Sequence, residues 1–558
     1  MNAGLEPDGY SSSDSRGQAD DPPVVAISSS MDETMGSLRA PLNGDLSLQQ
    51  VAAVVWRALD LDTSARNLRA IIKPDSWVVV KPNIVTSRGT PGSLYWDRGV
   101  PHRGQNTDLR AIVAIVDYIL KHCQPRRVSI AEGGAEWRRL GEPDTEPQAT
   151  EDGWTVHWPE YGGLSYVDLV ADWGKSSPGI VDIVDLNYDE FRFLPVPDPH
   201  QSGLGALQYR GARARPADRF GRSSYVSGSG VLRDGYPVPA TILDCDVLIS
   251  CPALKVHLAS GTSLAIKNYV GTMAPSLQQR NFKNIAHDGD LERGFVDAFS
   301  YHPADYAILE GFWGTEGNGP QWGDDVQHNI VIASADSVAA DAVGSAVMGY
   351  NAEDLMYLQL SARKGFGEMD LRHLQVVGRP IAEVQRLFRL GTGRSGITYN
   401  GRGVRNWLVA PVGDEPSPSG WTRVDSEDRY IDLTYHLGPG SPTRVWAYTE
   451  IECERSLTLE TWLGSDGPAA VYYGREQVLA LSPADGHHLG EARYKLTLPA
   501  GRSGLLLRAT KGGNALGFSL LLCGQPGCLP LGVHYLSPGE AEASAAVEAC
   551  QSCPPDLL

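Results

Sequence analysis

Short apolar runs alternate with longer stretches of helical periodicity over the first 390 residues. The runs are bounded by polar residues, which is typical of buried parallel strands. The periodic stretches predict amphipathic helices. Because strand, helix and strand in succession favour right-handed crossovers, we expect an α/β domain whose mostly parallel sheet is flanked by helices. The predicted strands are 24–28, 77–80, 127–131, 181–186, 246–250, 306–310, 329–333 and 374–377, and the main predicted helices are 47–59, 109–123, 164–173, 291–300, 336–350 and 381–390.

The pattern changes at about Gly391, where GTGRSGITYNGRG predicts a linker. From Trp421 onward, alternating apolar and polar residues with frequent turns predict an all-β sandwich. Its predicted strands are 429–437, 444–454, 457–464, 469–474, 494–501, 504–510 and 517–523. The predicted organisation is a disordered tail (1–22), the α/β domain (23–390), a linker (391–412), the β-sandwich (413–535) and a C-terminal tail (536–558) with a short helix at most.

The stretch CPALKVHLASGTSLAIKNYVG follows the predicted strand 246–250 and carries the strongest candidate chemistry. It holds Lys255 and His257, and then Lys267 and Asn268 on a helical run among apolar neighbours. Burying such groups is costly unless an anion meets them, and ligands of open α/β sheets lie beyond the carboxyl ends of strands. We therefore predict a cationic cup for a small anion or a polarised carbonyl. The alternative is that each lysine reaches solvent and the histidine bonds a backbone carbonyl.

Other polar residues follow predicted strands at the same edge. Lys81 and Asn83 follow the strand 77–80, and we expect Pro82 to end that strand. Glu132, followed by two glycines, ends the strand 127–131, and fits either ligand approach or a tight turn. Asp108 stands before a helix, as a cap or as a ligand-binding residue. The long loop 86–106 is expected to be functional or a lid.

Two carboxylates follow the strand 306–310 within a glycine-rich segment, EGFWGTEGNGPQWG, which we expect to be a loop. Glu310 and Glu316 could do acid–base work opposite the lysines or hold a metal, and the alternative is turn chemistry with solvated carboxylates. Asp341 lies inside a predicted helix and either pairs with a cup lysine or faces solvent. A weaker metal candidate is His287, Asp288 and Asp290, which are more typical of a solvated loop.

The composition narrows the function classes. The chain has a net charge of −19 and a pI near 5.1. Because nucleic acids are themselves negatively charged, we expect no nucleic-acid partner. No apolar run is long enough to span a membrane. No signal peptide is apparent, which indicates a cytoplasmic protein, although export is not excluded. The paired cysteines near the end (Cys523, Cys528, Cys550 and Cys553) are compatible with zinc, disulfides or free thiols.

Several motifs together resemble the domain of unknown function 362 family, over about residues 23–390. They are VVVKPN, the Thr107-Asp108 helix start, VSIAEGG, CPALKVH, SLAIKNYVG, ILEGFWGTEGNGPQWG, ASADSVAADAVGSAVMGY and KGFGEMDL. The family carries no settled reaction. Many of its members bind iron–sulfur clusters through cysteine runs, but this chain has no CxxCxxC, so that role is not carried over. The family's signatures fall on Lys81, Asn83, Lys255, His257, Lys267 and Asn268.

The β region resembles jelly-roll sandwiches appended to secreted glycosidases, through the segments 459–479 and 505–522. Such modules bind carbohydrate or pack on a neighbouring domain. The resulting prediction is a small-anion binder with acid–base chemistry carried by Lys255, His257, Glu310 and Glu316. A non-catalytic scaffold tethered to a glycan or partner by its sandwich is the alternative. The cofactor is unknown, with a divalent metal left open, and the oligomeric state is not predicted.

Overall fold

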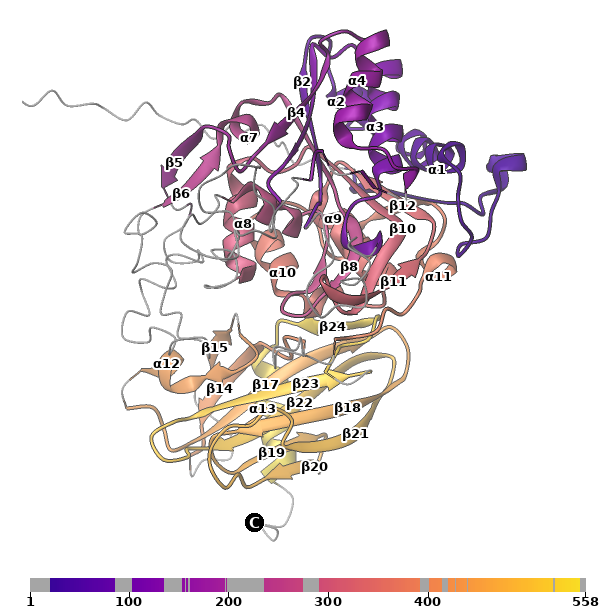
Figure 1. The fold of residues 1–558 in the computed structure, drawn as a ribbon. Helices are drawn as coiled ribbons and strands as arrows, with labels where there is room; N and C mark the ends of the chain where they lie inside the picture. Colours follow the sequence, from indigo (N-terminus) through magenta and orange to yellow (C-terminus); the bar gives the residue numbers. More distant parts are fainter. Residues whose placement is uncertain are drawn as a thin grey trace, which may run out of the picture.

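The structure of the protein is a computed structural model, which describes residues 21–85, 103–134, 153–155, 157–158, 161–195, 197, 235–273, 291–391, 401–413, 420–426, 428–438, 440–524 and 527–551. Figure 1 shows an α/β part, indigo to salmon, lying against a β part coloured orange to yellow. The predicted loop at 86–102, the HDGD segment at 287–290 and most of the predicted N-terminal tail lie outside the described residues.

The α/β part is built on one mostly parallel sheet, as predicted. Its strand order is β13-β1-β12-β10-β7-β2-β3-β4, and β12 runs antiparallel to both of its neighbours while the other pairs in this row are parallel. The strands are β1 (Val24–Ser29), β2 (Trp77–Pro82), β3 (Arg127–Glu132), β4 (Val181–Asp185), β7 (Val247–Cys251), β10 (Tyr306–Asn318), β12 (Ile330–Ser334) and β13 (Gln375–Gly378).

Helices cover both faces of this sheet because its strands alternate their apolar side chains between two cores. In β2, Val78 and Val80 enter one core and Val79 enters the other. The first core is shared with α1 (Leu48–Leu61), α3 (Leu109–His122) and α4 (Tyr166–Ser176). The second is shared with α7 (Ala240–Asp244), α8 (Leu291–Tyr301), α9 (Ser337–Val347) and α10 (Met356–Arg363).

The helix starts follow the predicted capping chemistry. The Ser47 hydroxyl accepts from Gln50 N, and the Gln50 side chain accepts from Ser47 N, which closes a capping box at α1. Asp108 accepts from Arg110 N at the start of α3, and Asp336 accepts from Ala339 N at the start of α9. Each cap satisfies a backbone donor that the helix itself leaves unpaired.

The segment after Glu310 is strand rather than the predicted loop. β10 continues to Asn318, pairs with β11 (Trp322–Gln327), and also pairs with β8 (Ala253–His257), which in turn pairs with β9 (Gly261–Ser263). The glycines permit this close pairing, since a Cβ at Gly314 would lie 2.5 Å from the carbonyl oxygen of Leu254. Lys255 and His257 therefore stand on a short strand of their own, beyond the end of β7.

Pro82 is also part of a strand, against the prediction that it ends β2. β2 pairs with β3 only as far as Val80, whereas its pairing with β7 continues to Pro82 opposite Cys251. At Pro82 the strand thus has one neighbour instead of two, and a residue that cannot donate a backbone hydrogen bond is tolerated there.

Three smaller predictions differ from the structure. The helix expected over 381–390 is limited to α11 (Ile381–Val384). The strand expected over 429–437 contains only β16 (Ile431–Asp432) followed by α12 (Leu433–Leu437), which Asp432 caps by accepting from Tyr435 N. The range 391–412 expected as a linker contains β14 (Asn406–Pro411), which pairs with β17 (Arg444–Cys453).

The β part consists of two antiparallel sheets that enclose their own core, which confirms a β-sandwich. One sheet has the order β15-β14-β17-β22-β19-β20 with β24 beside β17, and the other has the order β16-β23-β18-β21. α13 (Glu540–Gln551) covers the outer face of the first sheet. The remaining strands are β15 (Thr422–Asp425), β18 (Leu457–Ser465), β19 (Ala469–Tyr473), β20 (Glu476–Leu481), β21 (Ala492–Leu498), β22 (Gly501–Thr510), β23 (Gly517–Cys523) and β24 (Val533–Leu536).

Polar contacts join the sandwich to the α/β part. The Asn351 amide donates to the carbonyls of Pro530 (2.8 Å) and Val533 (2.9 Å). The buried carboxylate of Asp354 accepts from the backbone N–H groups of Arg402 (2.9 Å) and Leu529 (3.2 Å). Because each contact pairs a buried group from one part with backbone of the other, the two parts meet along a specific junction.

Candidate functional site

Lys81, Glu132 and Asn268 form a buried polar network at the carboxyl ends of β2 and β3. The Lys81 Nζ lies 3.0 Å from both carboxylate oxygens of Glu132 and 3.0 Å from Oδ1 of Asn268. All three side chains are at most 2 % exposed. The Asn268 amide nitrogen donates in turn to the Lys81 carbonyl and to the Ser250 hydroxyl. The structure thus brings together three predicted binding residues that are far apart in the sequence.

Backbone groups complete the network around the Glu132 carboxylate. Gly133 N donates to Oε1 at 2.7 Å and Ile84 N donates to Oε2 at 3.2 Å. Gly271 lies directly over the ion pair, since a Cβ there would be 1.9 Å from Glu132 Oε1 and 2.6 Å from Lys81 Nζ. A side chain at position 271 would displace the pair, so glycine is required for this approach.

Lys255 lies beside this network, and no carboxylate of the described residues is bonded to it. Its Nζ donates to Oδ1 of Asn83 and to the carbonyl oxygen of Gln105, the latter at 2.9 Å. Thr107 holds the same region together, because its hydroxyl accepts from Asn83 N and donates to the Cys251 carbonyl. Asn83, predicted to bind the ligand, and Lys255, predicted to be catalytic, are thus in direct contact.

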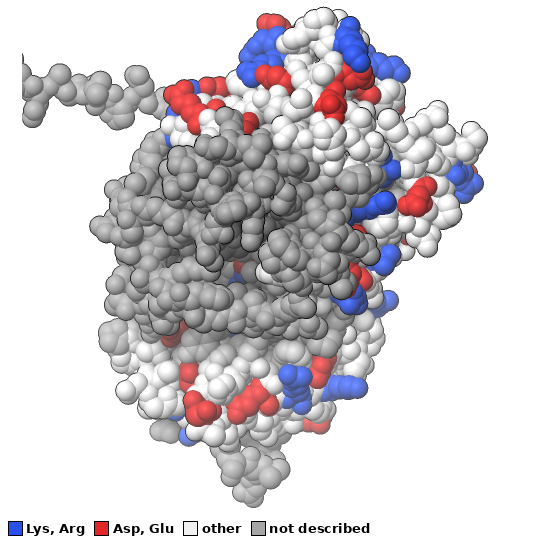
Figure 2. Space-filling view, viewed as in Figure 1, with Lys and Arg blue, Asp and Glu red and all other residues white. Residues whose placement is uncertain are grey.

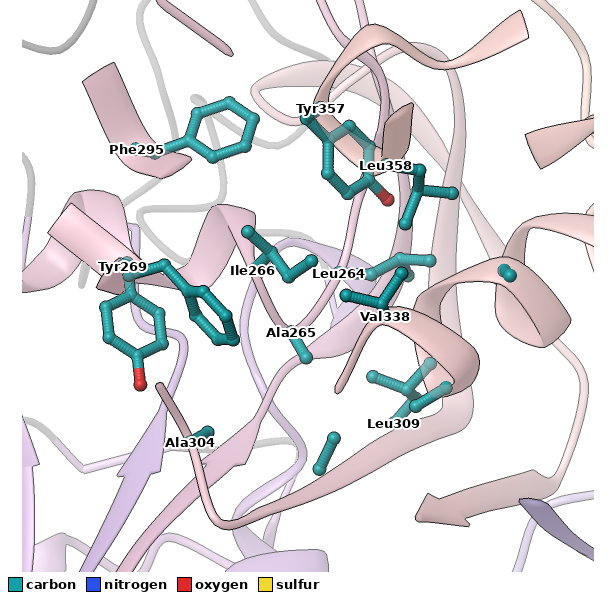
Figure 3. Packing of buried hydrophobic residues seen from close by; sticks show 14 of the residues in the cluster. Leu264, Ala265, Ile266, Tyr269, Phe295, Ala304, Leu309, Val338, Tyr357 and Leu358 are labelled. Carbon is teal, nitrogen blue, oxygen red and sulfur yellow. The ribbon is translucent and has the colours of Figure 1, made fainter. Parts of the chain in front are cut away.

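Lys267 completes the cluster from η5 (Lys267–Thr272), whose preceding residues are set in the apolar core. Figure 3 shows Leu264 and Ile266 packed below Phe295 and Tyr357. Among the described residues, the contact made by the Lys267 ammonium is with the Phe295 ring, 5.6 Å from its centroid. Lys267 is 6 % exposed, so its charge is largely removed from water.

Burial shifts the pKa values of Lys255 and Lys267. Burial and the charge of Lys267 together lower the pKa of Lys255 to about 7, against the opposing effect of Glu310 and Glu132. Burial alone lowers the pKa of Lys267 to about 7. Burial also lowers the pKa of Lys81, but its ion pair with Glu132 acts against that shift. Lys255 and Lys267 are thus poised to gain or lose a proton near neutral pH.

Glu310 is the carboxylate of the cluster that also titrates near neutral pH. It is fully buried in β10 and accepts from Asp108 N and Phe312 N, both at 3.0 Å. Burial and the neighbouring Asp108 together raise the pKa of Glu310 to about 8, against the opposing effect of the two backbone donors and Lys255. Asp108 itself forms an ion pair with Arg110 at 2.6 Å, so its carboxylate serves the helix start and that arginine.

Two predicted catalytic residues are engaged in other contacts. His257 Nδ1 accepts from the backbone N–H groups of Ala259 (3.1 Å) and Ser260 (3.3 Å). Glu316 accepts from Arg389 at 2.8 Å, on the outer side of β10. Residue Thr315, not Glu316, is the strand partner of Lys255, and successive side chains of a strand point to opposite faces. The structure therefore does not bring Glu316 to the lysines.

Asp341 neither pairs with a lysine nor faces solvent, which were the two alternatives predicted for it. It is fully buried and accepts from Ala265 N (2.8 Å) and Ile266 N (3.0 Å), which lead into η5. Burial raises the pKa of Asp341 to about 8. It thus positions the segment that carries Lys267 instead of pairing with a lysine.

Two further polar residues, Gln105 and Thr315, are not indicated by the sequence, although their side-chain polar atoms are buried and have no hydrogen-bond partner in the described part of the chain. Neither belongs to a recognisable motif, since a lone glutamine or threonine among glycines is usually read as turn chemistry. Only the distance from Lys255 to the Gln105 carbonyl and the pairing of Thr315 with Lys255 reveal them.

Other candidate chemistry can be assessed only in the described part of the chain. No group of three or more metal-binding side chains occurs there. Among the described residues, Cys523 and Cys528 are free thiols and are not joined to each other. No helix within it has the length and apolarity needed to cross a bilayer. On the face of the molecule drawn in Figure 2, acidic and basic residues are interspersed over the described part of the surface.

The fold and this cluster define an α/β protein with buried lysines at strand ends, joined to a β-sandwich. Residues 167–346 match the family described as Domain of unknown function (DUF362), which confirms the resemblance over that range. The matched range contains Lys255, Lys267, Asn268 and Glu310 but not Lys81 or Glu132. The sequence motifs before residue 167 and after residue 346 lie outside it.

A thylakoid-associated protein from Synechocystis sp. is 29 % identical to this chain over 102 residues, which are 18 % of this chain and 32 % of that protein. The chain thus spans about a third of this relative's length. Among solved structures, a GH2 beta-galacturonidase from Eisenbergiella tayi bound to galacturonate aligns at 13 % identity and a TM-score of 0.16, over 21 % of this chain and 22 % of that one. A beta-glucosidase from Kluyveromyces marxianus in complex with glucose aligns at 14 % identity and a TM-score of 0.20, over 31 % and 22 %. At these TM-scores the likenesses carry no argument.

Proposed function

We propose that the protein binds a small anionic ligand, of the carboxylate or phosphate class, against Lys255 and Lys267. The observation that carries the proposal is which groups each buried amine contacts. Lys81 has a carboxylate partner at 3.0 Å, whereas among the described residues Lys255 is bonded only to neutral oxygens and Lys267 contacts an aromatic ring. Two buried amines without a bonded counter-charge are costly, and an anion between them would offset that cost.

We further propose that the site moves a proton. Lys255 with a pKa of about 7 and Glu310 with a pKa of about 8 exchange protons readily at neutral pH. An anion next to Lys255 favours its charged form, so ligand binding would raise the pKa of this amine. A reaction that needs an acid and a base on one small ligand is the chemistry that such a pair supports.

Thermal unfolding tests the binding proposal. The wild type, Lys255→Met and Lys495→Met would be heated with increasing phosphate, oxalate, malonate or succinate, at an ionic strength held constant with sodium chloride. Lys495 is an exposed residue of β21 and serves as the matched control. A ligand at 100 times its Kd stabilises a protein by about 2.7 kcal/mol, which is easily measured. We expect at least one anion to raise the Tm of the wild type and of Lys495→Met but not that of Lys255→Met. If no anion raises the Tm, or Lys255→Met responds equally, the proposal is wrong.

Calorimetric titration tests the proton transfer. Binding would be measured at pH 8 in buffers of different ionisation enthalpy, which gives the number of protons taken up. Because both amines are mostly neutral at pH 8 and an anion favours their charged forms, we expect proton uptake in the wild type and less uptake in Lys255→Met. Binding without any proton uptake would contradict the role of Lys255.

A further inference from the structure

Three elements, η3 (Arg103–Gln105), β8 and β10, pack against one another around Lys255, and two buried polar side chains on them have no hydrogen-bond partner among the described residues. The Gln105 carbonyl accepts from Lys255, but both polar atoms of the Gln105 side chain lack a hydrogen-bond partner although the residue is fully buried. An unpaired buried amide is costly, so it is seldom kept without a partner.

Thr315 presents a second unpaired group to the same place. It is the β10 residue that pairs with Lys255, and its buried hydroxyl has no partner. The position of Gly104 shows which way the hydroxyl lies, since a Cβ at Gly104 would be 2.8 Å from Thr315 Oγ1. The methyl group lies on the other side, 2.3 Å from a Cβ built at Gly323. The Thr315 hydroxyl therefore faces Gly104 of η3, which precedes Gln105 in the chain.

The two unpaired groups complement a ligand that has more than a charge. The Gln105 amide offers two N–H donors and an acceptor oxygen, and the Thr315 hydroxyl both donates and accepts. A ligand hydroxyl likewise donates one hydrogen bond and accepts others. An unsubstituted carboxylate supplies acceptor oxygens only, so it could pair with the donors of Gln105 and Thr315 but would leave the Gln105 amide oxygen without a donor.

We propose that the ligand is a hydroxylated carboxylate or phosphate ester, whose anionic group meets Lys255 and Lys267 and whose hydroxyl pairs with Gln105 and Thr315. This inference rests on the proposed function and specifies its ligand class. Gln105 and Thr315 then determine specificity, because a site that holds polar groups for a hydroxyl discriminates strongly against an analogue without one.

Matched ligand pairs test the inference by titration calorimetry. The pairs are malate with succinate, glycolate with acetate, and glycerol 1-phosphate with propyl phosphate, each differing in hydroxyl groups on one skeleton. We expect the hydroxylated member of at least one pair to bind at least tenfold more tightly to the wild type. In Gln105→Met and Thr315→Val we expect that preference to fall toward one, with the affinity for the unhydroxylated member unchanged.

Both substitutions preserve shape and keep the Gln105 carbonyl that binds Lys255. Ser361→Ala is the control, because Ser361 in α10 also has a buried unpaired hydroxyl but does not belong to this cluster. It should leave the tenfold preference intact. If the hydroxylated and plain anions bind equally to the wild type, or the preference survives in both variants, the ligand class is wrong while anion binding stands. If no anion binds at all, the proposed function itself fails.

Discussion

The ammonium of Lys81 lies 3.0 Å from each carboxylate oxygen of Glu132, and neither side chain reaches solvent. Glu132 is the last residue of β3 and Lys81 the last but one of β2, its parallel neighbour, so the pair joins the carboxyl ends of these two strands. Burial opposes both charges, and the pair persists because each remaining site of the carboxylate accepts a backbone N–H.

Removing one member of this pair should be strongly destabilising. Glu132→Gln leaves the Lys81 charge buried without a counter-charge, which should lower the free energy of unfolding by about 3–5 kcal/mol. Urea denaturation followed by circular dichroism measures it. The double variant Lys81→Met/Glu132→Leu should lose less than the sum of its single variants, because it leaves no uncompensated charge. For comparison, Asp172→Asn breaks an exposed ion pair with Lys175 and should have no measurable effect. Equal effects of Glu132→Gln and Asp172→Asn would show that the buried pair is not a structural requirement.

Gly271 should be intolerant of alanine for a related reason. The added Cβ would lie 1.9 Å from Glu132 Oε1. The resulting shift of the ion pair should cost about 2–3 kcal/mol of stability. Gly174, inside α4, is the matched control, because a Cβ there meets nothing within 4 Å. Gly174→Ala should stabilise the protein by about 0.5–1 kcal/mol through helix propensity. The midpoints of denaturant unfolding of both variants, compared with that of the wild type, measure these changes in stability. If Gly271→Ala left the stability unchanged, the Lys81–Glu132 pair could move freely.

The buried amine of Lys267 predicts how stability depends on pH. Its pKa is about 7 in the folded protein against an ordinary value of 10.5, so the unfolded chain binds more protons between these two pH values. Burying this amine therefore carries no protonation penalty above pH 10.5, and the penalty grows, so that stability is lost, as the pH falls from 10.5 to 7. Lys267→Met removes the penalty, so we expect the variant to exceed the wild type by up to about 4 kcal/mol at pH 7 and to match it near pH 10.5.

The measurement is urea unfolding at several pH values in chloride buffers without phosphate or carboxylate. The difference between variant and wild type is the useful quantity, because Glu310, with its raised pKa, contributes a dependence of opposite sign below about pH 8. Lys495→Met should show no such pH-dependent difference. A constant difference between Lys267→Met and the wild type across this range would mean that Lys267 stays charged in the fold.

Periodicity was sufficient for most of the sheet and its helices, because each of those elements buries a regular apolar face. It failed at 311–318, where glycines that normally interrupt strands instead let β10 approach β8 closely. It also failed at 433–437, where an alternating run forms α12 after the Asp432 cap. In both places a contact made by distant residues decided the local structure, and no local pattern records that contact.

The lysines of the site were predictable because a charge within an apolar segment is conspicuous in sequence. The partners of these lysines were harder to predict. Glu132 was predicted as a strand-end residue, but its ion pair with Lys81 depends on strand order. Asp341 bonds backbone N–H groups of Ala265 and Ile266, which any sequence would present equally. Gln105 and Thr315 differ from ordinary turn residues only by being buried and unpaired, which is a property of the fold alone.

The junction between the two parts of the chain should respond to pH through His534. This residue of β24 lies between two carboxylates, with Nε2 3.1 Å from Glu454 in the sandwich and Nδ1 3.6 Å from Glu353 in the α/β part. The nearby carboxylate of Glu353 raises the pKa of His534 and Glu454 adds to this, while burial and the charge of Arg372, itself paired with Glu452, oppose it. A raised pKa gives stability that is fully present below about pH 6.5 and is lost as the pH rises through the folded-state value.

We therefore expect His534→Gln, which is never charged, to be less stable than the wild type at pH 6 and to approach it at higher pH. Scanning calorimetry at pH 6 to 9 would follow this through the Tm and through the separation of the transitions of the two parts. His488→Gln is the control, since His488 is exposed and pairs with Asp485 within the sandwich. If the wild type and His534→Gln differ by the same amount at every pH, His534 is neutral in the fold and the junction depends instead on Asn351, Asp354 and the Arg372–Glu452 pair.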